Sequence, residues 1–168
     1  MPLYTVDSSQ SRIEVRARSR IHDTTSVFDS IRGSVEAAPE TLRENGARAS
    51  FTVDMGSFDA GDWLKNKKLA SEIDPKRYPT ATFELARLER ISDRDHGGFE
   101  VAARGRLRYR NHTLEIEISG TGTMDVEGIE ARGHFDLDLR DLGMKPPRFL
   151  MFKMDPELTI DVFLRATT

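Results

Sequence analysis

Most of this chain alternates apolar and polar residues, and that two-residue period restricts what it can fold into. A β-strand points successive side chains to opposite faces, so alternation predicts strands with one apolar and one polar face. The clearest example is Ala47 to Met55, in which every second residue is apolar. The pattern occurs eight times, near residues 12–18, 24–37, 47–55, 81–91, 99–109, 114–118, 129–139 and 158–166. We therefore predict an all-β protein.

Short connections between these segments favour an antiparallel up-and-down barrel. Residues 93–98 and 125–128 have turn composition, and a two-residue turn at Asn111-His112 would place Arg106 opposite Glu117 and Arg108 opposite Glu115. Closing eight strands into a barrel removes the two exposed sheet edges. Strands of about 12 residues, at about 3.3 Å each, make this barrel elongated. Gly33 is expected at a bulge that bends the second strand.

The alternation breaks between Gly61 and Phe83, where the sequence predicts a short helix inserted between strands 3 and 4. Asp62 is suited to the N-cap, and Asp74-Pro75 offers a second cap. Trp63, Leu64, Leu69 and Ile73 are interpreted as one apolar side of this helix. A helix with an apolar side needs a surface to cover, and we expect it to close an end of the barrel, with Trp63 and Leu64 partly buried.

Length and composition narrow the class of protein further. The 168 residues fit one domain, 1–168, and the formal net charge of −3 provides no general attraction to nucleic acid or anionic membrane. Its apolar runs are far shorter than the roughly 20 residues of a transmembrane helix. The N-terminal residues lack the pattern of a signal peptide, so we expect a cytoplasmic protein, or a periplasmic one if this N-terminus has been trimmed. A homodimer is compatible with the sequence.

Several short motifs, in this order and spacing, resemble the YceI-like family of lipocalin-like polyisoprenoid-binding proteins. They are Ile21-His22-Asp23, Gly33, Lys68-Leu69, Tyr78-Pro79, Phe83, Gly105 to Leu107 and Leu137 to Gly143. The resemblance covers nearly the whole chain. It implies an elongated eight-stranded barrel that binds a long-chain lipid or isoprenoid without catalysis and without a cofactor. The best-known members differ in having a secretion signal and a glycine where this chain has Ser26.

The candidate ligand-binding residues are the large apolar ones of the inward faces, of the helix and of the Met- and Phe-containing segment before the last strand. They are Phe51, Val53, Met55, Trp63, Leu64, Phe83, Phe99, Leu107, Ile118, Phe135, Leu137 and Phe149. The same residues could instead fill the barrel, which would then be a stress-related or protein-interaction module without a ligand. An enzyme acting on a lipid is the weakest of the three hypotheses.

No catalytic or metal-binding motif stands out. None of the four histidines has a recognised metal-ligand spacing, and His134 alternates with Asp136 and Asp138 as a solvated polar face would. The serines lack a G-x-S-x-G turn. Alternating arginines at 12–20 and 104–110 lack the interleaved aromatic residues of nucleic-acid readers, although the first row could meet a lipid head group at the barrel rim.

Overall fold

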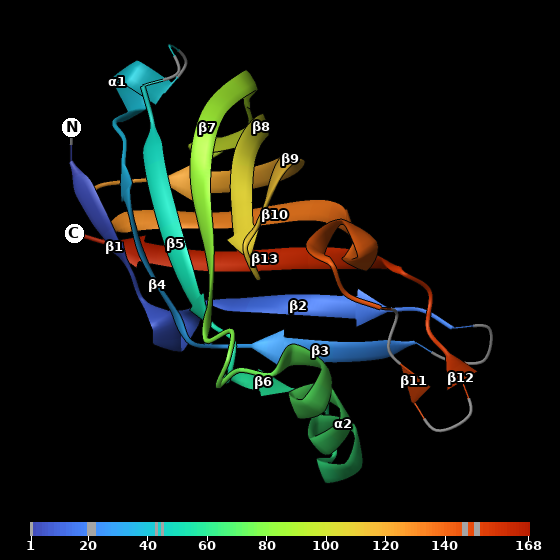
Figure 1. Cartoon of the computed structure of the whole chain (residues 1–168). Helices are drawn as coiled ribbons and strands as arrows, with labels where there is room; N and C mark the ends of the chain where they lie inside the picture. The colour runs from blue at the N-terminus through green and yellow to red at the C-terminus, as the bar shows by residue number, and fades with distance from the viewer. Residues whose placement is uncertain (1, 20–22, 43, 45, 146–147, 150–151) are drawn as a thin grey trace.

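The structure is a computed structural model that describes residues 2–19, 23–42, 44, 46–145, 148–149 and 152–168. Its described strands form a closed antiparallel barrel with eight positions around the ring (Figure 1). The ring follows the order β1-β4-β5-β7-β8-β9-β10-β13, and β1 pairs with both β4 and β13. The predicted fold class is therefore confirmed.

Five of the eight positions are long, continuous strands. These strands are β7 (Thr80–Asp93), β8 (Gly98–Tyr109), β9 (His112–Met124), β10 (Gly128–Asp138) and β13 (Glu157–Thr167). Each pairs with its neighbour through a short turn or, for β13, after a longer excursion. Turns lie at 93–98 and 125–128 as predicted, closed by hydrogen bonds from Arg94 N to Gly98 O and from Asp125 N to Gly128 O.

The other three positions are each split into two pieces by a bend. The pieces are β1 (Leu3–Val6) and β2 (Arg12–Ala17), β3 (Thr24–Phe28) and β4 (Ile31–Glu36), and β5 (Arg48–Asp54) and β6 (Phe58–Asp59). β2 pairs with β13 and β3, and β6 pairs with β3, so these bent pieces continue the sheet from β13 in the order β2-β3-β6. β1 was not predicted from the sequence as a separate strand.

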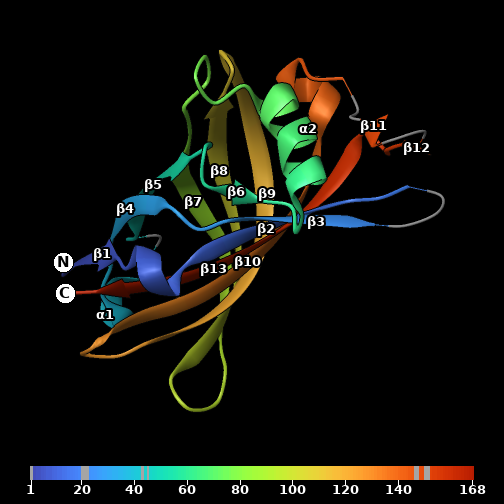
Figure 2. The ribbon, with the colours of Figure 1, turned by 90° about the horizontal axis from the view of Figure 1, so that it is seen from below.

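Short helices and a small hairpin lie in the connections between the barrel strands. The 11-residue helix α2 (Trp63–Ile73) is the predicted one, and it lies next to β3 and β6 at one end of the barrel (Figures 1 and 2). A one-turn helix α1 (Pro39–Leu42) lies between β4 and β5. The 3₁₀ helices are η1 (Ser8–Gln10) and η2 (Leu139–Leu142), and β11 (Arg148–Phe149) pairs with β12 (Phe152–Lys153). No helix in the described part of the chain has the length and apolarity of a membrane span.

The turn between β8 and β9 corrects the predicted register. It consists of Arg110 and Asn111, both with positive φ (54° and 64°), as a two-residue hairpin turn of type I′ requires. Because this turn lies one residue earlier than predicted, each residue of β8 faces a residue of β9 two positions earlier than predicted. Arg106 therefore faces Glu115, and Arg104 faces Glu117, with which it forms an ion pair. A shift of two leaves the inward face unchanged.

Gly33 does not form the bulge that the sequence suggested. Its strand, β4, pairs with β5 in continuous register, with Gly33 opposite Phe51. A Cβ atom at this position would lie 2.3 Å from the carbonyl oxygen of Ser50 and 2.7 Å from the Phe51 ring. Glycine is needed here for the close approach of the two strands. The register shifts occur in β7, between Leu85 and Arg87 and between Leu88 and Arg90.

Candidate functional site

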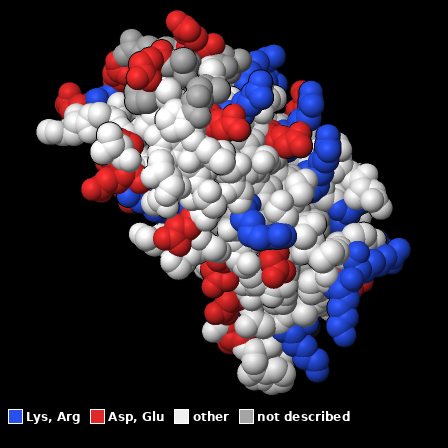
Figure 3. Space-filling model, turned by 90° about the vertical axis from the view of Figure 1, so that its left-hand side faces the viewer, with Lys and Arg blue, Asp and Glu red and all other residues white. Residues whose placement is uncertain are grey.

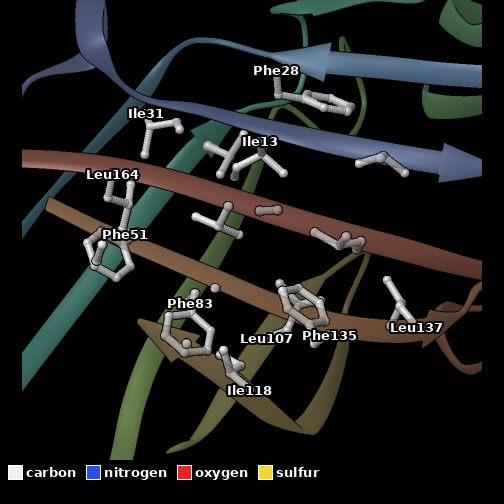
Figure 4. A pocket seen from close by; sticks show the side chains of 18 of the residues that line it. Ile13, Phe28, Ile31, Phe51, Phe83, Leu107, Ile118, Phe135, Leu137 and Leu164 are labelled. Atoms are coloured by element: carbon white, nitrogen blue, oxygen red, sulfur yellow. The ribbon is translucent and has the colours of Figure 1, made fainter. Parts of the chain in front are cut away.

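The barrel interior is hollow. A cavity of about 380 Å³ lies inside it, and apolar side chains of the long strands and of the bent pieces line most of its wall. Figure 4 shows Phe51, Phe83, Phe135, Leu107 and Ile118 pointing into the space that the strands enclose. The volume is within the range of small-molecule pockets, about 300–1,000 Å³. Such a cavity fits a flexible apolar chain better than a polar metabolite.

Nine of the twelve residues predicted to contact a ligand lie on this cavity wall. They are Phe51, Val53, Met55, Phe83, Phe99, Leu107, Ile118, Phe135 and Leu137. Their inward orientation follows from the alternation, because a strand with one inward face buries every second residue. The same signal could have identified further wall residues on the bent strands and the last strand, among them Ile13, Val15, Phe28, Ile160 and Val162.

Helix α2 contributes to the cavity through its C-terminal half. Leu69 and Ile73 line the cavity, and Ile73 is buried. The tip of the β8–β9 hairpin holds this end: the Tyr109 hydroxyl donates to the Ile73 carbonyl (3.2 Å) and the Arg110 guanidinium donates to the Glu72 carbonyl (3.0 Å). Burial raises the pKa of Tyr109, which keeps its hydroxyl protonated as a donor. The helix end is thereby fixed to the barrel.

The N-terminal turn of α2 is exposed, so the predicted burial of Trp63 and Leu64 was wrong. Asp62 does cap the helix, accepting from Lys65 N at 2.8 Å. Trp63 is 72% exposed and Leu64 is 49% exposed, and neither lines the cavity. Leu64 and Ile73 are nine residues apart, which at about 3.6 residues per turn places them on opposite sides of the helix.

Two other predictions near this end have different outcomes. Asp74 does not begin a second helix: it ends α2 in a left-handed conformation (φ 50°), with its N–H donating to Ala70 O. Phe149, predicted to contact a ligand, lies in β11, but its side chain is not described. His22, part of one of the short motifs, lies entirely outside the described residues. From η2 and the segment that follows it, Leu139, Leu142 and Met144 line the cavity.

The orientation of α2 gives a prediction with an internal control. If the cavity binds an apolar chain, Leu69→Ala should weaken the binding of a long-chain fluorescent probe by roughly 3- to 10-fold, because the variant loses apolar contact with the ligand. Leu64→Ala, on the opposite side of the same helix, should change the affinity by less than about 2-fold. Equal losses in the two variants would show that the exposed side of α2 also meets the ligand.

Polar side chains on the outer face form local pairs. His134 Nδ1 lies 2.8 Å from Asp161 Oδ1 on the neighbouring strand, and both side chains are partly solvated. Within the described ranges no group of three or more His, Cys, Asp or Glu residues is arranged to hold a metal ion. Arg104 pairs with Glu89 as well as Glu117. On the face shown in Figure 3, Lys and Arg lie mainly along one side and Asp and Glu mainly along the other, so this face carries both signs of charge.

A comparison with protein families matches residues 4–166 to the YceI-like domain. The chain belongs to the YceI-like family. This match covers both the continuous and the bent strands, and it confirms the resemblance found in the short motifs. Among curated proteins, no match was found.

Solved structures share the YceI-like fold at low sequence identity. BcnA of Burkholderia cenocepacia is 21% identical over 96% of this chain and 99% of its own, with a TM-score of 0.77. A polyisoprenoid-binding domain from Saccharophagus degradans, implicated in plant cell wall breakdown, is 13% identical over 98% of each chain, with a TM-score of 0.75. The YceI protein of Campylobacter jejuni is 11% identical over 90% of this chain and 88% of its own, with a TM-score of 0.63.

Proposed function

We propose that this protein binds one long-chain hydrophobic molecule, an isoprenoid or a related amphiphilic lipid, inside its barrel. The observation that carries the proposal is the apolar cavity of about 380 Å³ enclosed by the strands. Transferring a chain methylene from water into such a wall contributes about 0.8 kcal/mol, opposed by the ordering of the chain. The polyisoprenoid-binding domain of Saccharophagus degradans, which has the same fold, supports this function.

The cavity also weighs against the alternative of a filled barrel. Phe51 and Phe83 stack on one another with ring centroids 6.0 Å apart, and still leave space between the walls. Protein interiors normally contain few voids larger than a water molecule, because an empty apolar void forfeits dispersion contacts. A ligand that supplies those contacts accounts for a void of this size. We propose a carrier or storage role without catalysis.

A titration of lipid-stripped protein tests this function. A fluorescent long-chain probe should bind saturably, with about one site per chain, and an unlabelled polyprenol should displace it. The cavity inside a barrel of eight strands has room for one slender ligand, which sets the expected stoichiometry. Non-saturable binding, or binding that the polyprenol does not reduce, would contradict a defined interior site.

A further inference from the structure

A buried hydroxyl in the cavity wall, that of Thr24, has no hydrogen-bond partner among the described residues. The Thr24 side chain is 3% exposed, and its hydroxyl Oγ1 makes no hydrogen bond within the described part of the chain. Thr24 opens strand β3 and lines the cavity. Leaving a buried hydroxyl without a partner is unfavourable, so such groups are nearly always hydrogen-bonded in folded proteins. An orphan hydroxyl beside a ligand cavity indicates a partner supplied by the ligand.

The neighbourhood of Thr24 defines what that partner can be. Burial alternates along β3, so Thr24, Ser26 and Phe28 share its inward face. Thr24 pairs across the sheet with Ala17, which in turn pairs with Leu158, and both are buried. Ser26 is 8% exposed and also lines the cavity. Two hydroxyls therefore lie two residues apart on an otherwise apolar part of the wall.

The charged residues of the wall are solvent-accessible. Glu72 is partly exposed and pairs with Lys68 at 3.4 Å, while Arg132 and Lys145 are exposed. No charged residue in the described part of the wall is buried as Thr24 and Ser26 are. Bringing an ionised carboxylate or phosphate to Thr24 would bury a charge without a counter-charge among the described residues of the wall, which is strongly unfavourable. The partner group must be polar and uncharged.

We propose that Thr24 and Ser26 are the anchor for an uncharged, hydrogen-bonding head group of the bound long-chain molecule. This anchor rests on the proposed function and specifies its ligand class: a neutral amphiphile with a carbonyl, amide or hydroxyl group, not an anionic lipid. The head lies beside β3, near the end of the barrel where α2 lies, and the chain extends along the apolar wall. Thr24 is the primary contact, because its hydroxyl has no other described partner.

Three probes of equal chain length test the anchor: tetradecane, myristamide and myristate. Each would displace a fluorescent long-chain probe from lipid-stripped wild-type protein at neutral pH. Myristamide should compete roughly 3- to 10-fold better than tetradecane, the preference that one hydrogen bond gives. Myristate should compete less well than myristamide. In Thr24→Val, which replaces the hydroxyl by a methyl group, the amide preference should disappear, and the ligand-free protein should melt at a higher temperature.

Thr25→Val is the matched control, because Thr25 is exposed on the outer face of the same strand. It should keep the amide preference of the wild type. An unchanged preference in Thr24→Val, equal competition by all three probes in the wild type, or tighter binding of myristate would overturn the anchor while leaving a long-chain binding function intact. If none of the three competes and the fluorescent probe itself does not bind, the proposed function fails and the anchor fails with it.

Discussion

Phe135→Asp should destabilise the barrel by more than about 3 kcal/mol or prevent it from folding. Phe135 points into the cavity from β10, opposite Ile160 of β13, and packs against the main apolar cluster. An aspartate there would place a carboxylate in an apolar interior without a counter-charge, one of the most destabilising changes a single substitution can make. Domains of this kind are stable by only about 5–15 kcal/mol in total. Chemical denaturation measures the loss.

The control for this variant is His134→Ala, one residue away. His134 faces solvent on the same strand and contacts Asp161 at 2.8 Å. Exposed pairs of this kind contribute little to stability, so the free energy of unfolding should change by no more than about 0.5 kcal/mol. Equal destabilisation by the two substitutions would mean that the inward and outward faces of β10 have been exchanged.

Ala103→Phe should lower the affinity for a long-chain ligand by at least about 10-fold while leaving the protein folded. Ala103 is buried on the inward face of β8, between its partners Leu88 and Ile118. A phenyl ring in this place would occupy space that the ligand chain needs. Extra atoms in a filled core destabilise by about 1–3 kcal/mol, whereas a ring that enters a void buries apolar area without overpacking. The free energy of unfolding should therefore change little or rise.

Ala102→Phe separates the effect of the ring from the effect of its position. Ala102 lies on the outer face of β8, opposite Arg90 and Ser119. This variant should bind the ligand as the wild type does. The two measurements together distinguish a hollow barrel from a filled one, because a filled barrel would lose stability in Ala103→Phe and would have no ligand affinity to lose.

The strands, and which of their residues point inward, were predictable because the alternation of apolar and polar residues can be recognised within each strand alone. Phe51, Phe83 and Phe135 are on three different strands, and all three line the cavity as predicted. The register between strands was harder, since it depends on which two residues take positive φ in a turn. The sequence Arg110-Asn111-His112 gives only a weak preference, and the predicted turn was displaced by one residue.

The ends of the barrel were least predictable. Leu64 is apolar and lies on a helix beside the cavity, yet it faces solvent, because the orientation of α2 is set by contacts made elsewhere in the chain. Tyr109 and Arg110, which hold the end of α2, are 36 and 38 residues from the helix residues that they contact. Thr24 was also missed as a site residue: a threonine at an inward position is noticed only when the structure shows that its hydroxyl has no partner.

Organic extraction of natively purified protein, followed by mass spectrometry, tests the central claim most directly. If the barrel binds a long-chain molecule, the extract should contain a lipid at about one equivalent per chain, and the proposed anchor at Thr24 predicts that its head group is uncharged. Extracts of unfolded protein purified in the same way provide the background. An extract without lipid, together with stripped protein that takes up neither isoprenoid nor fatty chain, would contradict the account and leave an empty barrel.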